Sequence, residues 1–232
     1  MTLMLKRKID SYIRNYYNTT RNALLITGAR QTGKTFSIRE FGKSFKSFVE
    51  INFVDMPEAV EVFRGAKSSA DVLLRLSAIA RVPLVKGDTL IFFDEVQKCP
   101  EIVTVIKFLV EEGSFRYILS GSLLGVELKD LRSEPVGYMG VKDMYPLDFE
   151  EFVMCMGVGE NVVAALRNAW MNRMPVDAFV HSKMMELFRL YLVVGGMPAA
   201  VCKYIDSNNL QEVMNVQQDI IRLYKRDIAQ YD

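Results

Sequence analysis

The sequence predicts an α/β fold, a mostly parallel sheet with helices on both faces, followed by an all-helical subdomain. Two observations support this prediction. Short apolar runs alternate with segments of helical periodicity up to Pro146, and the pattern is helical from Asp148 onward. Half of the 232 residues are hydrophobic and a quarter are charged, as is typical of a globular protein. We therefore expect two domains, residues 1–146 and residues 147–232.

The individual elements follow from periodicity and turn residues. A first, amphipathic helix is predicted over residues 3–17, because Leu5, Ile9 and Ile13 recur on one face. The predicted strands are 23–28, 47–53, 89–93, 115–119 and 138–145. The predicted helices between them are 33–43, 57–64, 69–81 and 100–112. Breaks near 157–160, 174–175, 195–198 and 207–209 divide the helical subdomain.

A phosphate-binding motif lies between the first strand and the helix that follows it. Residues 28–35 read Gly-Ala-Arg-Gln-Thr-Gly-Lys-Thr and match the pattern G-x-x-x-x-G-K-[ST]. Its glycines let backbone N–H groups converge on phosphate oxygens, beside the positive end of the helix. Lys34 adds a charge for the β- and γ-phosphates, and Thr35 adds a hydroxyl for Mg²⁺. The predicted nucleotide-binding residues are Gly28, Ala29, Arg30, Gln31, Thr32, Gly33, Lys34, Thr35 and Phe36.

Two acidic residues end the apolar strand 89–93. Ligands bind at the carboxyl ends of strands in open α/β sheets, and carboxylates there are costly unless they are used. We expect Asp94 to hold Mg²⁺ and Glu95 to polarise a water for attack on the γ-phosphate. Ser120 and Ser122 follow the next strand, where a hydroxyl would orient that water or contact the γ-phosphate; the alternative is a plain serine–glycine turn.

Composition limits the other chemistry. The net charge of +1 gives no strong attraction to nucleic acid or membrane, and the basic cluster at residues 6–8 is either a solvated helix face or a DNA contact. Three distant cysteines are expected to be free thiols in a reducing compartment. The single histidine, His181, excludes a His-rich metal site and is expected to be structural. With neither an eighteen-residue apolar run nor a secretory signal, we expect a cytoplasmic protein without a membrane partner.

The phosphate loop, the Phe-Phe-Asp-Glu strand end and Ser-Gly-Ser at 120–122 resemble the AAA+ superfamily of P-loop ATPases. Residues 144–152, 195–201 and 219–228 are similar to one prokaryotic AAA-type ATPase family, whose members often carry a C-terminal restriction-endonuclease-like domain. The resemblance implies an ATP- and Mg²⁺-binding core with a helical lid. It places Lys34 and Thr35 at the phosphates, Asp94 at the metal, Glu95 at the water, and Ser120 or Ser122 as the first sensor.

The resemblance also carries expectations about partners. Arg132 lies in the interval where family members carry an arginine finger that acts on a neighbouring subunit of a homo-oligomer. The Gly-Arg pair typical of that interval is missing, so the alternative is a solvated loop residue. The chain stops where family members continue, so we expect a truncated protein whose missing C-terminal domain would contact DNA or another protein.

Three functions fit these residues. The first is a Mg²⁺-dependent ATPase that binds ATP, releases ADP and moves its lid with the nucleotide state. The second is a nucleotide-gated module that binds DNA or protein with little hydrolysis; Glu95 argues against it, because binding alone needs no water-polarising acid. The third is a small-molecule kinase, which the scattered arginines of the helical subdomain disfavour, since a transferred phosphate needs clustered positive charge. These arginines are Arg167, Arg173, Arg189 and Arg222.

Overall fold

The computed structural model describes residues 5–122 and 137–229, which form two compact units. The sheet unit is Ile9–Met144, and the helical unit combines residues 5–8 with the chain from Tyr145 onward. The chain therefore passes from one unit to the other twice, after Lys8 and after Met144.

The sheet unit contains a five-stranded sheet with the order β2-β3-β4-β1-β5, in which every neighbouring pair is parallel. This order places β1 and β3 on either side of β4, so the carboxyl ends of three strands meet at one edge. The strands are β1 (Ala23–Gly28), β2 (Ser47–Asn52), β3 (Thr89–Asp94), β4 (Arg116–Ser122) and β5 (Met139–Asp143).

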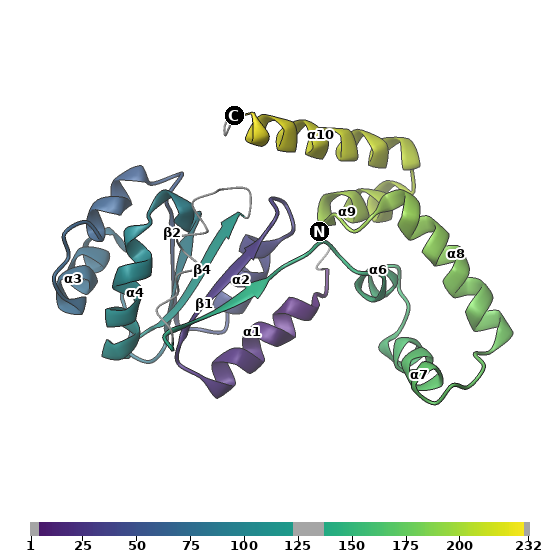
Figure 1. Ribbon diagram of the computed structural model, residues 1–232, viewed down its shortest axis with the longest axis horizontal. Helices are drawn as coiled ribbons and strands as arrows, with labels where there is room; N and C mark the ends of the chain where they lie inside the picture. Colours follow the sequence, from purple (N-terminus) through teal and green to yellow (C-terminus); the bar gives the residue numbers. More distant parts are fainter. Residues whose placement is uncertain (1–4, 123–136, 230–232) are drawn as a thin grey trace. The chain divides into compact units, whose positions relative to one another are not determined.

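Helices cover both faces of the sheet, and Figure 1 shows the two layers. Leu24 and Ile26 of β1 pack with α1 (Lys8–Thr19) and α2 (Lys34–Gly42). Leu25, on the opposite face, packs in a second cluster, which includes residues of three further helices of this unit. These are η1 (Pro57–Val62), α3 (Ser69–Ile79) and α4 (Glu101–Glu112). Because both faces are covered, every residue of β1 and β3 is buried, as the uninterrupted apolar runs predict.

Two predicted elements differ most from the structure. The first helix begins at Lys8 and not at residue 3, because Leu5 and Arg7 are buried in the helical unit and do not continue the helix. The fourth strand runs to Ser122 and not to Leu119. Ser120 and Ser122 are therefore strand residues, and the alternative of a serine–glycine turn is wrong.

The helical unit has its own core, built from buried residues of the arm 5–8 and of four helices around Phe152. Its helices are α6 (Phe149–Cys155), α7 (Glu160–Met171), α8 (Ala178–Val194), α9 (Pro198–Ser207) and α10 (Leu210–Ile228). The predicted breaks are confirmed: Gly157, Gly195 and Asn208 adopt positive φ between successive helices. Gly196 also allows close packing, because a Cβ there would lie 2.1 Å from the carbonyl oxygen of Leu147.

Within the described ranges, no single helix has the length and apolar character to cross a membrane, although α8 and α9 pass that test together as a pair bent by 118°. The cysteines Cys99, Cys155 and Cys202 are free thiols, as predicted.

Candidate nucleotide-binding site

The loop between β1 and α2 has a backbone that glycine alone accommodates at two points. Gly28 has a φ of 146°, and a Cβ there would lie 2.2 Å from the carbonyl oxygen of Met144. Met144 is fixed at this position because its N–H donates to the carbonyl of Thr27 at 2.7 Å. Gly33 has a φ of 99° and begins α2 without a side-chain cap. Because Gly33 has no side chain to cap them, the first N–H groups of α2 meet no competing cap at this position. An anion-binding site requires such uncapped N–H groups.

Lys34 is buried and folds back over the loop. Its Nζ donates to the carbonyl oxygens of Gly28 at 2.9 Å and Ala29 at 2.8 Å. Burial lowers the pKa of Lys34, while the nearby carboxylates of Glu95 and Asp94 act in the opposite direction. The lysine thus lies over the loop and within the field of the acidic pair at the end of β3.

Asp94 is the centre of a polar cluster that joins four elements. Its Oδ2 accepts hydrogen bonds from Thr35 Oγ1 at 3.0 Å and from Asn52 Nδ2 at 3.4 Å. Its Oδ1 accepts from the Ser120 hydroxyl and from the N–H of Glu95 at 3.0 Å. Four donors hold this buried carboxylate in one orientation and compensate for its removal from water.

The donor set fits Mg²⁺. Thr35 and Asp94 present a hydroxyl and a carboxylate that already contact each other, and hard cations prefer such oxygen ligands. No group of three or more His, Cys, Asp or Glu side chains that could enclose a metal occurs in the described part of the chain. A cation held by Thr35 and Asp94 would therefore need further oxygen ligands from water or phosphate, as is usual for Mg²⁺ in nucleotide sites.

The two serines of β4 have different partners. Ser120 is fully buried and donates to Asp94, so it orients the Asp94 carboxylate. Ser122 lies opposite Gly28 in the pairing of β4 with β1, which places it beside the start of the phosphate loop. Its hydroxyl oxygen accepts a hydrogen bond from Gln97 Nε2 at 3.4 Å.

Glu95 follows Asp94 in a left-handed backbone conformation, with a φ of 56° and a ψ of 44°. A non-glycine residue in this region is strained, and such strain is typical of functional positions. The side chain is half-buried, and its Oε2 accepts a hydrogen bond from Gln97 Nε2. Glu95 is thus held beside the strand end that carries Ser122.

The remaining predicted residues lie on or beside the loop. Thr32 is buried, and its hydroxyl donates to the carbonyl of Ala29 at 3.0 Å. Arg30 is half-buried and close enough to Lys34 to lower the pKa of that lysine. Gln31 has a φ of 63°, and Phe36 is exposed on α2. Arg132 lies outside the described residues, so its predicted role as an arginine finger stays a prediction.

Two residues of this cluster were not predicted. Asn52 ends β2, which pairs with β3 so that Asn52 lies opposite Asp94. A polar residue at a strand end beside the acidic pair was the signal for it. Gln97 is two residues beyond Glu95, in the short helical turn η2 (Val96–Lys98). Its only sequence signal was its closeness to the acidic pair, because burial of a glutamine is not readable from periodicity.

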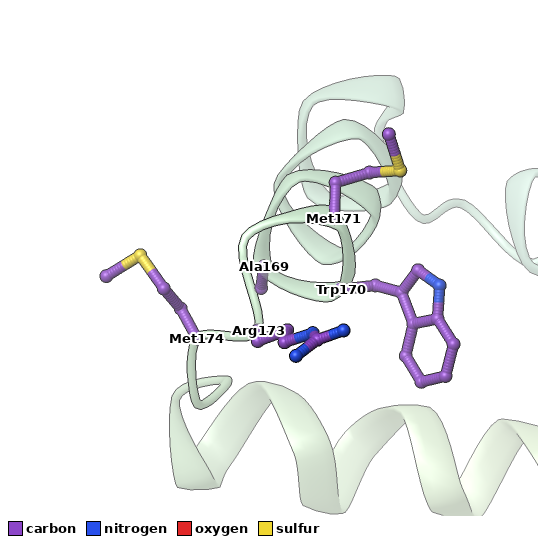
Figure 2. Close-up of a pocket in the computed structure, with 5 residues that line it drawn as sticks. All are labelled: Ala169, Trp170, Met171, Arg173 and Met174. Atoms are coloured by element: carbon purple, nitrogen blue, oxygen red, sulfur yellow. The ribbon is translucent and has the colours of Figure 1, made fainter.

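A separate pocket of about 570 Å³ lies at the end of α7 in the helical unit. In Figure 2, Trp170 and Arg173 point toward the same space, while Met171 and Met174 point away from it. Ala169 completes the lining. None of the predicted site residues takes part in this pocket.

The family of the chain follows from its sequence. Residues 20–153 match the model of the AAA domain family, and they include the phosphate loop, the acidic pair and both serines. The chain belongs to this family, which makes it a nucleotide-binding protein of the AAA ATPase class. Residues 185–232 match a second model, that of a domain of unknown function. No curated protein matches the sequence.

Solved structures with the same fold include the Walker-type ATPase PABY2304 of Pyrococcus abyssi. It is 14% identical, with a TM-score of 0.57 over 99% of this chain and 77% of that chain. PCH-2 of C. elegans is 14% identical, with a TM-score of 0.38 over 93% of this chain and 64% of that chain. The Aeropyrum pernix ORC1 protein in complex with DNA is 14% identical, with a TM-score of 0.41 over 66% of this chain and 48% of that chain. Of these three, PABY2304 alone has a TM-score above 0.5, and at 14% identity the likeness concerns the fold alone.

Proposed function

We propose that the protein is a Mg²⁺-dependent ATP hydrolase. The observation that carries this proposal is the convergence of Thr35, Asp94 and Glu95 at the mouth of the phosphate loop. Binding alone would require the loop and its lysine. A carboxylate held next to the metal-site aspartate, on a strained backbone, supports hydrolysis in addition.

In this proposal each residue has a separate task. The N–H groups of the loop and Lys34 bind the β- and γ-phosphates, so the Lys34 ammonium exchanges the carbonyls of Gly28 and Ala29 for phosphate oxygens. Thr35 and Asp94 would hold Mg²⁺, which supplies positive charge for the phosphate oxygens. Ser120 keeps the Asp94 carboxylate oriented.

Glu95 acts on the attacking water. As the water oxygen forms its bond to the γ-phosphorus, the bond from that phosphorus to the β–γ bridging oxygen breaks. One proton of the water passes to the Glu95 carboxylate, and the products are ADP and inorganic phosphate. Ser122, beside the loop on β4, is the residue of the two serines that we propose as the sensor of the γ-phosphate.

We also propose how turnover is used. Residues 1–146 would serve as the ATPase core and residues 147–232 as a lid whose position follows the nucleotide state. A neighbouring subunit would complete the site with Arg132. A DNA or protein partner would bind through a C-terminal restriction-endonuclease-like domain. The resemblance of the lid motifs to the prokaryotic AAA-type family supports these proposals.

Two substitutions separate binding from hydrolysis. Lys34→Ala should abolish ATP binding, because it removes the ammonium at the phosphates. Glu95→Gln should retain ATP binding and lower the hydrolysis rate by about 10²–10⁴-fold, the usual contribution of a general base. Titration calorimetry with ATP and Mg²⁺ measures the first effect, and release of inorganic phosphate measures the second.

Lys43→Ala is the matched control, because Lys43 is an exposed lysine at the end of the same helix and pairs with Glu40. It should bind and hydrolyse ATP as the parent does. A Lys34→Ala protein that binds ATP with the parent's affinity would refute the phosphate-loop assignment. A Glu95→Gln protein with the parent's rate would instead favour a nucleotide-gated binding module.

A further inference from the structure

The turn after β3 holds a buried glutamine that no step of the proposed reaction uses. Gln97 lies in η2, and its side chain is almost fully enclosed. Its Nε2 donates to Oε2 of Glu95 and lies 3.4 Å from Oγ of Ser122. One amide nitrogen therefore contacts both the water-polarising carboxylate and the strand end beside the phosphate loop.

The orientation of this amide follows from its neighbour. Only the NH₂ half of a carboxamide donates hydrogen bonds, so this half faces the carboxylate of Glu95. Oε1 of Gln97 consequently faces elsewhere, and within the described residues it is buried without a hydrogen-bond partner. A buried acceptor without a partner is destabilising, so in a native protein it calls for an explanation. The contact with Glu95 is thus maintained at a cost in stability.

The contact with Gln97 restricts the conformational freedom of the Glu95 side chain. A glutamate side chain has three rotatable bonds, and a half-buried one samples several rotamers unless a partner fixes it. The left-handed backbone sets the direction in which the side chain leaves the main chain. Gln97 then fixes the carboxylate at its far end. Gln97 also contacts Ser122, which lies opposite Gly28 in the sheet. The position of the Glu95 carboxylate is therefore linked to the start of the phosphate loop.

We propose that Gln97 is a positioning residue for ATP hydrolysis, which fixes the Glu95 carboxylate where it accepts the proton of the attacking water. This inference rests on the proposed function. Gln97 makes no hydrogen bond to Lys34 or Thr35. Its removal should therefore act on turnover and leave ATP affinity unchanged, since a misplaced general base slows the chemical step alone.

Two substitutions test this in the full chain. Gln97→Met keeps the length and volume of the side chain and removes the donor. Gln97→Asn keeps the donor and withdraws it by one methylene group. Each should lower kcat about tenfold at an unchanged Kd for ATP, because the base loses its fixed orientation. Lys98→Ala, an exposed neighbour in the same turn, is the control and should keep the parent's kcat. If the methionine variant does not fold, the asparagine variant decides.

A double-mutant cycle separates positioning from a general loss of structure. In the Glu95→Gln background, Gln97→Met should cause no further loss of kcat, because the group that it positions is already gone. An equal tenfold loss in both backgrounds would overturn the inference, since Gln97 would then act independently of Glu95. A Gln97→Met protein with an unchanged or higher kcat would also overturn it, the higher rate showing that Gln97 restrains Glu95.

These outcomes are distinct from failure of the proposed function. A parent protein without ATP turnover, or a Glu95→Gln variant with the parent's rate, would overturn the hydrolase and this inference together. An active parent that loses its rate on Glu95→Gln and keeps it on Gln97→Met would overturn this inference alone.

Discussion

At the scale of single residues, the site depends on backbone positions that admit no side chain. Gly28 is the sharpest case, because a methyl group there meets a carbonyl oxygen of β5's extension at 2.2 Å. That carbonyl belongs to Met144, which is itself bonded to the last part of β1. The sheet therefore cannot yield at this point without breaking a backbone hydrogen bond beside the phosphate loop.

We expect Gly28→Ala to lower the free energy of unfolding by about 2–5 kcal/mol, the sum of overpacking and positive-φ strain, and to weaken ATP binding. Gly65→Ala is the control, because Gly65 has a φ of 63° but no atom within 4 Å of an added Cβ. It should cost only about 1 kcal/mol of backbone strain. Urea unfolding of the two variants measures the difference, and equal losses would contradict the steric account.

At the scale of elements, α6 and α7 are joined by an exposed ion pair. Arg167 on α7 donates to Glu150 on α6, with 2.7 Å between Nε and Oε1. The second partner of Glu150 is Lys8, whose Nζ lies 2.6 Å from Oε2. Hydrogen bonds from Arg167 first, and from Lys8 second, lower the pKa of Glu150 from 4.5 to about 2.

The direction of the pH effect follows from this shift. The folded pKa lies below the unfolded value, so the stabilisation is fully present above about pH 4.5 and is lost as the pH falls through 2. Because the pair is exposed to solvent, Arg167→Ala should lower the free energy of unfolding only slightly at pH 7. That difference from the parent should shrink toward zero at pH 2, in urea unfolding at several pH values. Arg189→Ala, an exposed change on α8, should show no such pH dependence; an undiminished Arg167→Ala effect at pH 2 would contradict the assignment.

At the scale of the whole molecule, the helical unit is assembled from two distant parts of the chain. Residues 5–8 join it through Arg7, whose Nε lies 3.2 Å from Oε1 of Glu151, with both side chains 6% exposed. Arg7 also donates to the carbonyl of Tyr145 at 2.8 Å. The two segments at which the chain changes unit are therefore bonded to each other.

We expect Glu151→Ala to destabilise the helical unit by about 3–5 kcal/mol, because it leaves a buried guanidinium without its carboxylate. It also removes the acceptor of the Lys8 N–H and half of the capping box of α6. Circular dichroism, which follows the loss of helix, reports unfolding of this largely helical unit. Glu186→Ala, which removes an exposed pair with Lys183, should change the free energy of unfolding by less than about 1 kcal/mol. Equal effects of the two would show that burial of the pair is unimportant.

Much of the fold was predictable because its signals are local. The phosphate-loop glycines, Pro100 and Gly113 at the two ends of α4, and the apolar run 89–93 each depend on neighbours in sequence. The start of the first helix was not predictable in this way. Leu5 and Ile9 fit one helical stripe, yet they belong to different cores. Periodicity alone does not show where the chain passes from one core to another.

The residues of the candidate site also divide into those with a local sequence signal and those without one. Motif spacing indicated Lys34, Thr35, Asp94 and Glu95, and the structure brings their side chains together. Two hydrogen-bond partners of these carboxylates, Asn52 and Gln97, were missed because their positions depend on strand register and burial. Those properties arise only when the sheet assembles.

The divided origin of the helical unit has a consequence for the order of folding. Lys8 donates its N–H to a carboxylate 143 positions later in the chain. A segment made early in synthesis must therefore wait for one made late, while the whole of Ile9–Met144 emerges between them. Closing so long a loop is slow and entropically costly unless the intervening chain is already compact. The sheet unit should consequently fold first and bring the two ends of its own sequence together. Folding of the helical unit would then depend on prior folding of the sheet unit.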